Sequence, residues 1–441
     1  MIPLIRGFKD ILPDDTPVWK AIEETAAALF QSFGFKEIRL PIVEKAELFQ
    51  RSIGENTDIV EKEMYTFSTG KGEMITLRPE ATASVVRAYI QQQLYAKDPV
   101  QKLYTIGPMF RRERPQKGRY RQFYQINAEV FGIGAPYIDA QLIVMLWNLF
   151  ERLAIGGLSV QLNSLGCPVC RPAFKQALTD MLEEGTGVLC ADCLRRKDKN
   201  PMRVLDCKVP ACRDVMKDAP SMTDYLCEDC ASHFSKVQSA LGLQQIPFVL
   251  NPRLVRGLDY YTRTAFEIQT DALGAQNAIA GGGRYDGLVK ALDGPEQPAI
   301  GFAIGLDRLV ELVSQAMPQQ SLTPDVFIAA IGEELQEKAF EWSCALGLSG
   351  VQTEIDFSGK SLKALMKRAD RLGAAHVLIA GSQEMAQGSV ILRNMKNKEQ
   401  VPVPIDGMVD HIKQYLKDYQ CCKESEKKKK AIPEPVRVIR F

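Results

Sequence analysis

The stretch FRRERPQKGRYRQFYQINAEVFG at residues 110–132 places a strongly basic loop directly before a strand pattern. The apolar run KLYTIGPMF at 102–110 precedes it, so the sequence predicts two strands that hold the loop in a fixed place. The loop contains one acid, Glu113, and six cations: Arg111, Arg112, Arg114, Lys117, Arg119 and Arg121. Arginine suits phosphate because its planar guanidinium bonds bidentately and keeps its charge. The loop therefore predicts contact with a polyanion; the alternative is a solvated basic hairpin tip.

The strand after the loop has one polar face. Side chains alternate along a strand, so Gln125, Asn127 and Glu129 share a face that Phe123 and Phe131 frame. The opposite face carries Tyr124, Ile126, Ala128 and Val130. A row of polar groups between aromatic rings predicts the floor of a pocket; the alternative is a half-exposed antiparallel sheet.

The 441-residue chain has the composition of a soluble globular protein, with 46% hydrophobic and 25% charged residues. Its length suggests about three domains, and no apolar run is long enough to span a membrane. The N-terminus lacks the long apolar segment of a secretory signal. The net charge of +1 gives no overall attraction to nucleic acid. With only three histidines, the chain offers little for histidine acid–base chemistry.

The spacing of apolar residues predicts further helices and strands on both sides of the basic loop and its two strands. Residues 17–33 predict an amphipathic helix. The segment EIRLPIVEK at 37–45 predicts a strand, which Pro41 assigns to an edge or an interface. A second helix is predicted at 139–154 and a strand at 264–270. From residue 325 strands and helices alternate up to a last helix ending near 418, which predicts a separate α/β domain.

Shifts in composition divide the chain into parts. We expect the two parts of a core at 1–166 and 246–320, separated by a cysteine-rich insertion at 167–245. Pro318 and the stretch QQSLTP mark a linker to the C-terminal α/β domain at 325–420. The basic tail 421–441, with Lys427 to Lys430 and two prolines, is predicted to be disordered.

Three segments after the insertion carry candidate binding residues. VRGLDYYTRTAFEI at 255–268 combines Arg256 with Tyr260 and Tyr261, which suits a charged ligand with an aromatic body; the alternative is a surface turn. AGGGRYDGL at 280–288 permits close approach of the backbone but does not fit the dinucleotide fingerprint GxGxxG. GFAIGLDRLVEL at 301–312 places Arg308 at a strand-to-helix transition. The chain has no P-loop motif, which argues against a Walker-type ATPase.

These segments together resemble a known family. FRRERPQKGRYRQFYQINAEVFG is similar to motif 2 of class II aminoacyl-tRNA synthetases, GFAIGLDRL to motif 3, and the segment around Pro41 to motif 1. TLRPEATAS at 76–84, RGLDYYTRT at 256–264 and GGGRYDGL at 281–288 resemble segments specific to histidyl-tRNA synthetases. The resemblance runs from about Ile5 to about residue 418.

The resemblance implies an α/β fold with an α+β catalytic core. The core would be an antiparallel sheet flanked by helices, with an inserted Cys-rich helical subdomain and a C-terminal α/β anticodon-binding domain. It implies a cytoplasmic homodimer that makes histidyl-adenylate from histidine and ATP with Mg²⁺, then charges tRNA(His). The attacking carboxylate is already ionised near neutral pH, so activation needs cations and positioning rather than a base.

The resemblance also assigns roles to residues. Among ATP-binding groups, Arg111 would hold the α-phosphate, Arg308 the γ-phosphate and Glu113 the adenine. Arg256 would lie beside the substrate carboxylate and the α-phosphate, and it would be catalytic together with Arg111 and Arg308. The implied histidine-binding residues are Glu80, Thr82 and Gln125 at the amino group, with Glu129 and Tyr261 at the imidazole nitrogens and Tyr260 beside them. Arg114 and Gln116 would approach the tRNA acceptor stem. Cations that could contact the anticodon stem, or simply form a solvated helix face, are Lys360, Lys363, Lys367, Arg368 and Arg371.

The insertion departs from the family pattern by its cysteines. The pairs are Cys167/Cys170, Cys190/Cys193, Cys207/Cys212 and Cys227/Cys230, and 19 residues separate the first two, a zinc-site spacing. A CxxC turn points two thiolates at one tetrahedral ion, and disulfides are disfavoured in the cytosol. We expect one or two structural Zn²⁺ sites with open pairing, in which His233 could replace a thiolate. The alternatives are a vestigial metal-free site and redox-active thiols.

Two other function classes compete with the ligase. A regulatory paralogue of ATP phosphoribosyltransferase, from histidine biosynthesis, resembles the catalytic domain but is not a catalyst. That paralogue lacks the anticodon-binding domain and departs from the arginine and RGLDYY motifs, both of which this chain has. A generic RNA-binding protein would account for the basic loop but not for Glu129, Tyr261 or the glycine run.

Overall fold

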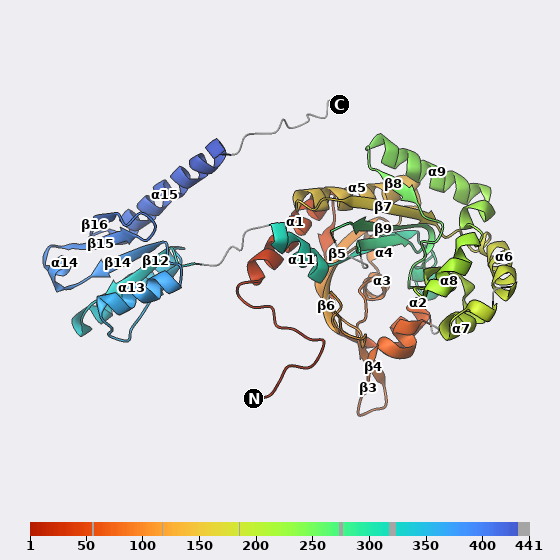
Figure 1. The fold of residues 1–441 in the computed structure, drawn as a ribbon, viewed down its shortest axis with the longest axis horizontal. Coiled ribbons are helices and arrows are strands. Elements are labelled where there is room, and N and C mark those ends of the chain that lie inside the picture. The colour runs from red at the N-terminus through yellow and green to blue at the C-terminus, as the bar shows by residue number, and fades with distance from the viewer. Residues whose placement is uncertain (55–56, 117, 185, 273–276, 317–322, 431–441) are drawn as a thin grey trace. The chain divides into compact units, whose positions relative to one another are not determined.

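The computed structural model describes the chain except residues 55–56, 117, 185, 273–276, 317–322 and 431–441 (Figure 1). The chain forms two compact units, Met1–Gln320 and Ser321–Phe441. Lys117 and the predicted linker at Pro318 lie outside the described residues. In the described part, no helix is both long enough and apolar enough to cross a membrane.

An eight-stranded sheet is the centre of the first unit, as far as the described residues show, in the order β1-β5-β6-β11-β10-β9-β7-β8. The pairs β1–β5 and β7–β8 are parallel, and the other neighbours are antiparallel. The predicted antiparallel core sheet is therefore confirmed. In chain order its strands are β1 Lys36–Glu37, β5 Gln101–Phe110, β6 Gln122–Phe131, β7 Leu158–Ser164, β8 Phe248–Leu250, β9 Thr262–Thr270, β10 Ala278–Arg284 and β11 Ala299–Gly305.

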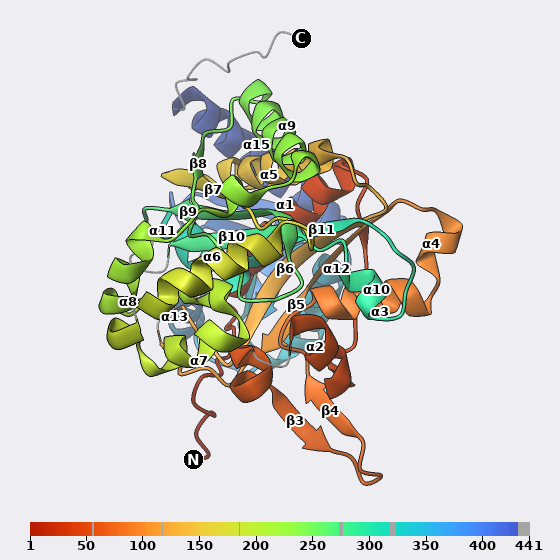
Figure 2. The same ribbon diagram turned by 90° about the vertical axis from the view of Figure 1, so that its right-hand side faces the viewer.

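Helices cover both faces of this sheet (Figures 1 and 2). On one face, the sheet shares one hydrophobic core with the helices α1 Thr16–Ser32, α5 Pro136–Arg152, α9 Glu228–Leu243 and α11 Leu306–Ala316. The predicted helix of 17–33 is α1, whose Ile22, Ala26 and Leu29 share one buried stripe. On the other face, α3 Thr82–Gln91 packs on Leu103 and Phe131. The short helices α4 Leu94–Lys97 and α10 Leu288–Ala291 complete this side.

A small sheet in the order β2-β4-β3 lies beside the large one. Its strands are β2 Val43–Lys45, β3 Tyr65–Ser68 and β4 Met74–Leu77, and α2 Ala46–Ile53 and the π-helical turn η1 Ile59–Glu63 accompany it. The prediction of one strand over 37–45 is wrong, because Pro41 separates β1 from β2 and the two join different sheets. The predicted edge position is confirmed for β1, which ends the large sheet.

The cysteine-rich insertion folds into short helices around a core of its own. Phe174, Leu178 and Leu182 of α6 are fully buried in that core. Before the chain returns to the large sheet through α9, the elements are α6 Arg171–Glu184, η2 Thr186–Val188, α7 Ala191–Lys199, η3 Pro201–Asp206, α8 Pro210–Val215, η4 Met216–Asp218 and η5 Met222–Tyr225.

The second unit is a five-stranded sheet, in its described residues, with the order β13-β12-β14-β15-β16. Its elements are β12 Val326–Ala330, η6 Glu333–Leu335, α12 Gln336–Leu348, β13 Thr353–Ile355, α13 Leu362–Arg371, β14 His376–Ala380, α14 Ser382–Ala386, β15 Ser389–Asn394, β16 Gln400–Pro404 and α15 Met408–Lys430. The predicted alternation of strands and helices is confirmed. Strand β16 was not predicted, because its sequence QVPVP has two prolines and proline disfavours strands. The strand forms because it lies at the edge of the sheet, where proline is tolerated.

The predicted end of the last helix is wrong. Helix α15 continues through Lys430, so residues 421–430 are helical where a disordered tail was expected. The cause is local: CCKESEKKKK at 421–430 contains neither glycine nor proline and is rich in good helix formers. Residues 431–441 lie outside the described residues.

A fully buried ion pair joins α5 to the sheet. Asp139 of α5 contacts the guanidinium of Arg284 in β10 at 2.7 Å, and both side chains are inaccessible to solvent. The same carboxylate accepts a hydrogen bond from Thr264 of β9 at 2.6 Å and lies 2.8 Å from His233 of α9. This carboxylate therefore connects the insertion's last helix with the two halves of the core.

We expect Asp139→Asn to lower the free energy of unfolding by about 3–5 kcal/mol, because it leaves the Arg284 charge buried without its main partner. Glu296→Gln is the control, since its ion pair with Lys290 is exposed and is expected to contribute about 0–1 kcal/mol. Urea unfolding of the three proteins measures both effects. Equal stability of Asp139→Asn and the control would contradict the role of this ion pair.

Candidate active site

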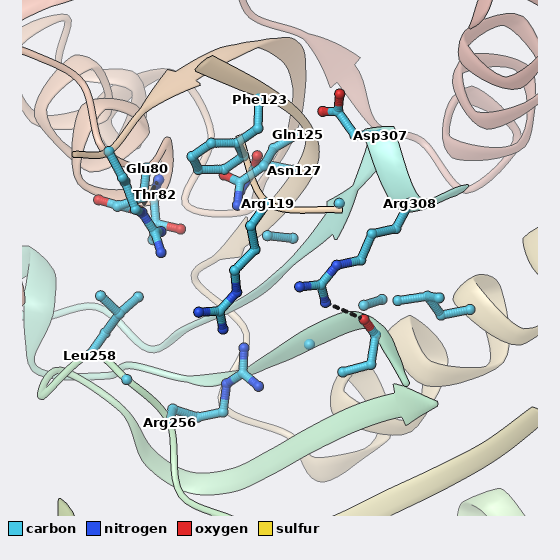
Figure 3. A pocket seen from close by; sticks show the side chains of 18 of the residues that line it. Glu80, Thr82, Arg119, Phe123, Gln125, Asn127, Arg256, Leu258, Asp307 and Arg308 are labelled. Carbon is cyan, nitrogen blue, oxygen red and sulfur yellow. Dashed lines mark hydrogen bonds between the residues drawn. The ribbon is translucent and has the colours of Figure 1, made fainter. Parts of the chain in front are cut away.

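A pocket of about 350 Å³ opens above the polar face of the central strands (Figure 3). Strands β6, β9, β10 and β11 form its floor, and the loop after β5, the turn before α3 and the segment before β9 form its walls. The structure thus brings most of the implied site residues together. Those that line the pocket are Glu80, Thr82, Arg111, Glu113, Gln125, Arg256, Tyr260, Tyr261 and Arg308.

Glu129 lies buried beneath the pocket. Its carboxylate accepts hydrogen bonds from the hydroxyls of Thr82 at 2.7 Å and Tyr285 at 2.5 Å. The residue opposite it on β11 is Gly301, where a Cβ atom would overlap the Glu129 carboxylate. Burial, with a smaller contribution from the Glu80 charge, raises the pKa of Glu129 to about 8 although both hydroxyls favour the charged form.

Hydrogen-bond acceptors gather at the same end of the pocket. The Glu80 carboxylate accepts the backbone N–H groups of Thr82 and Ala83 at the start of α3, at 2.6 and 2.9 Å. Its burial raises its pKa, which those two N–H groups oppose. Among the described residues, the side-chain oxygens of Gln125 and Asn127 are buried without a hydrogen-bond partner. Buried acceptors without donors favour a ligand that brings N–H groups, such as an ammonium group.

Cations occupy the other end of the pocket. The guanidinium groups of Arg119, Arg256 and Arg308 point toward one another in Figure 3, although they come from the loop, the segment before β9 and α11. Arg308 donates to the backbone oxygen of Ala278 at 2.8 Å. Burial lowers the pKa of Arg308, and the neighbouring Arg119 adds to this effect. Three converging guanidinium groups are suited to a ligand with several negative charges.

Arg256 is held flat on the sheet. Its Nη1 atom lies 2.5 Å from Oε1 of Glu267 on β9, and its guanidinium lies over the Tyr261 ring, 5.7 Å from the centroid. A Cβ atom at Gly281 of β10 would come within 2.5 Å of both terminal nitrogens. The glycine run therefore leaves the space that Arg256 fills.

The two tyrosines of this segment are buried at the wall of the pocket. The rings of Tyr260 and Tyr261 lie 4.6 Å apart, and Tyr260 also packs edge-on against Tyr285. Burial raises the pKa of both hydroxyls above the ordinary tyrosine value, so both stay protonated near neutral pH.

The basic loop divides between the pocket and the surface. Arg111 donates to the Pro79 backbone oxygen at 2.9 Å and lies over the Phe123 ring. Glu113 lies between Arg111 and Arg119, 3.9 and 3.2 Å from their nitrogens. Arg114 and Gln116 are exposed and do not line the pocket.

Several residues in or beneath the pocket were not assigned from the sequence. Asn127 lines the floor, as the alternation along 123–131 indicates, and Arg119 belongs to the basic loop. The sequence therefore contained evidence that could have assigned both residues to the pocket. Tyr285 lies within GGGRYDGL, but its contact with Glu129 joins positions 156 residues apart. Nothing in the sequence marked Glu267 or Asp307 as a pocket residue, since single acidic residues are common in amphipathic helices and strands.

The eight insertion cysteines form two groups of four in the structure. Cys167 and Cys170 join Cys227 and Cys230, while Cys190 and Cys193 join Cys207 and Cys212. The pairing that the spacing left open is thereby decided, and the two CxxC pairs separated by 19 residues are not partners. His233 belongs to neither group because it contacts Asp139.

Helix α13 of the second unit carries the predicted cationic face only in part. Lys363, Lys367 and Arg371 are exposed. Arg368 lies 2.6 Å from Asp356 and 3.0 Å from Glu354, and Lys360 lies 3.5 Å from Asp356. The first three are thus the better candidates for contact with a polyanion.

We expect the buried Glu129 carboxyl to make stability depend on pH. Its pKa rises from 4.5 to about 8 on folding, so in this interval the native state keeps a proton that the unfolded chain has lost. Relative to Glu129→Gln, the free energy of unfolding of the unchanged protein should fall by about 1.4 kcal/mol per pH unit across the interval. Urea unfolding at a series of pH values measures the difference. Parallel curves for the two proteins would contradict the burial of this carboxyl.

Comparison with known proteins agrees with this geometry. The family model described as histidyl-tRNA synthetase matches residues 7–309, and that described as anticodon binding domain matches 325–415. A protein named Histidine--tRNA ligase from Desulforapulum autotrophicum is 60% identical over 93% of this chain and 97% of its own length. Another of the same name from Desulfosudis oleivorans is 60% identical over 92% of this chain and 96% of its own length. The crystal structure of apo S. aureus histidyl-tRNA synthetase, 34% identical, matches with a TM-score of 0.79 over 94% of this chain and all of that one. The chain therefore belongs to the histidyl-tRNA synthetase family.

Proposed function

We propose that the pocket joins histidine to AMP and that the chain then transfers histidine to tRNA(His), as a histidine–tRNA ligase. The observation that carries this proposal is the division of one pocket into an end with buried acceptors and an end with converging arginines. An amino acid places its ammonium group and side chain at the first end and its carboxylate toward the second. The phosphates of ATP meet the arginines, so both reacting groups lie between the two ends.

Histidine is favoured by the hydrogen-bonding groups under the acceptor end. Glu80, Thr82 and Gln125 surround the proposed ammonium position, and Asn127 adds a fourth polar group. Glu129 and Tyr261 then bond the two imidazole nitrogens, with Tyr260 packed beside them. A ligand without these nitrogens leaves the buried groups unpaired, which penalises other amino acids.

Activation is a displacement at the α-phosphorus of ATP. A carboxylate oxygen of histidine forms the new bond to phosphorus while the bond to the pyrophosphate oxygen breaks. Arg256 and Arg111 offset the charge that develops on the α-phosphate, and Arg308 holds the γ-phosphate. Glu113 is assigned to the adenine. No group of the protein needs to remove a proton, since the carboxylate is already ionised.

Enzymes of this class use ATP with Mg²⁺, which shields the phosphate charges when bound. Such ions are held by one or two carboxylates together with phosphate oxygens. Glu267 lines the arginine end of the pocket; its Oε1 atom contacts Arg256, so its Oε2 atom is the one suited to this contact. The pocket residues therefore fit a phosphate-bound Mg²⁺.

Exposed polar and cationic residues are suited to binding tRNA(His), the substrate of the transfer step. Arg114 and Gln116 are exposed next to the pocket mouth and are assigned to the acceptor stem of tRNA(His). Lys363, Lys367 and Arg371 on α13 are assigned to phosphates of the anticodon stem. The proposed location is the cytoplasm, where tRNA is charged.

The regulatory alternative is not favoured. The relatives named Histidine--tRNA ligase match over nearly their whole length, and the match includes the anticodon-binding domain. The arginines and the RGLDYY segment that the alternative would lack line the pocket together.

We also propose a homodimer through the small sheet and the adjoining groove, which Pro41, Leu48 and Ile90 help to line. Val43 and Phe67 are large apolar side chains exposed on one face of this sheet. Ile42, just before β2, and Met74 of β4 are exposed as well. Exposed apolar side chains in one small region favour an interface. Sedimentation equilibrium should give twice the chain mass of 49.2 kDa. Val43→Asp with Phe67→Asp should give the single mass, while Leu348→Asp, at an exposed position of the second unit, should stay dimeric. A single-chain mass for the unchanged protein would contradict the dimer.

ATP–pyrophosphate exchange with each amino acid in turn tests the activation step. Exchange should require histidine and should fall about 10²–10³-fold in Arg256→Ala, because a donor to the developing charge is lost. Arg152→Ala is the matched control, since that arginine is exposed at the end of α5. Exchange with another amino acid, or with none in the folded protein, would overturn the proposed function.

A further inference from the structure

The two cysteine groups are nested along the chain. We call Cys167, Cys170, Cys227 and Cys230 the root site, because they join the start of α6 to the start of α9 at the two ends of the insertion. We call Cys190, Cys193, Cys207 and Cys212 the tip site, which joins the starts of α7 and α8. The tip site lies wholly within the loop that the root site closes. Short elements around a small core are stabilised most by cross-links of this kind.

The sulfur atoms have the spacing of a tetrahedral metal site. Within each group, all four lie within 4.8 Å of one another. The separation is 3.5 Å for Cys167–Cys170 and 3.9 Å for both Cys167–Cys227 and Cys190–Cys207. Four sulfurs at about 2.3 Å from one zinc ion lie about 3.8 Å apart. These sulfurs are too far apart for disulfide bonds, which need about 2.05 Å.

Backbone groups already point at the sulfurs. The N–H of Cys227 donates to the Cys170 sulfur at 3.1 Å, and the N–H of Cys190 donates to the Cys212 sulfur at 3.2 Å. Hydrogen bonds of this kind orient and stabilise thiolate ligands. The guanidinium of Arg171 is within electrostatic range of Cys167, Cys170 and Cys230, so it can offset the charge of a tetrathiolate.

Both sites lie next to residues that hold the Arg256–Tyr261 segment. Arg171, directly after Cys170, donates to the backbone oxygens of Leu165, at 3.1 Å, and Tyr261. Between the cysteine pairs of the tip site, Asn200 and Arg203 contact the Asp259 carboxylate at 2.9 and 3.2 Å, and Arg203 also contacts the Gly257 backbone oxygen. The insertion therefore holds a wall of the active-site pocket from outside.

We propose that the insertion binds two structural zinc ions, one at the root site and one at the tip site, each held by four thiolates. The ions fix Arg171 and Arg203 as positioning residues for the segment that carries Arg256 and Tyr261. Metal binding is independent of the proposed function, whereas the positioning effect rests on it.

Metal analysis of protein purified without chelators tests both the stoichiometry and the pairing. The unchanged protein should contain two zinc ions per chain. Cys170→Ser with Cys227→Ser should contain one, as should Cys193→Ser with Cys207→Ser. Cys170→Ser with Cys193→Ser damages both sites and should contain none. Cys344→Ser, at an exposed cysteine outside both groups, should keep two.

Each other result has a defined meaning. If the mixed variant kept one ion and the root variant none, the nested pairing would be wrong. Less than half an equivalent of zinc in the unchanged protein would overturn the proposal, as would two equivalents of iron instead. Should serine variants fail to fold, cobalt replacement in the unchanged protein decides: two equivalents with tetrahedral thiolate absorption support the proposal, and its absence overturns it.

Arg171→Ala tests the positioning effect. It should keep two zinc ions but raise the KM for histidine in pyrophosphate exchange several-fold, with a smaller change in the KM for ATP. Gln176→Ala, an exposed position on the same helix, is the control. Unchanged KM values would overturn the positioning role. Two zinc ions in a protein that exchanges with no amino acid would uphold the metal sites and reject the proposed function.

Discussion

The active site depends on one steric constraint: the side chains of Glu129 and Arg256 lie against the sheet, and this requires glycine on a neighbouring strand. Gly301 leaves room for the Glu129 carboxylate, and Gly281 leaves room for the Arg256 guanidinium. A Cβ atom at either position would overlap the neighbouring carboxyl or guanidinium group. Gly281 of GGGRYDGL and Gly301 of GFAIGLDRL thus matter because they lack a side chain, which leaves space for a neighbouring group, and not because they make the chain flexible.

This constraint lets one sheet hold a carboxyl group and a guanidinium group beneath the same pocket. The acceptor end and the arginine end share the floor strands, and Glu267 holds Arg256 at the arginine end. Burial keeps Glu129 protonated near neutral pH, with its pKa at about 8, while Arg256 stays charged. The same pocket can therefore receive an ammonium group at one end and phosphates at the other. The insertion adds support from outside by holding the backbone of the Arg256–Tyr261 segment.

Sequence patterns predicted the elements that depend on local periodicity. Strands β5 and β6, helix α1 and the alternating second unit follow from hydrophobic spacing, and the polar face of β6 follows from strand alternation. The failures are also local. Pro41 splits a predicted strand between two sheets, the prolines of QVPVP conceal the edge strand β16, and the lysine-rich residues after 420 continue a helix. Proline both breaks a strand and occurs at a sheet edge, and a lysine-rich segment can be either helical or disordered, so the sequence did not decide between the two structures in each case.

By itself, the sequence determined the family, the strand and helix order and the residue types available for the site, because these depend on motifs and short-range spacing. Only the tertiary structure decided which residues meet. Tyr285 reaches Glu129, Asp139 reaches Arg284, and Cys167 and Cys170 meet Cys227 and Cys230 rather than the nearer CxxC pair. The physical reason is that these partners lie dozens of residues or more apart, and the packing of the sheet and helices, not spacing along the chain, brings them together.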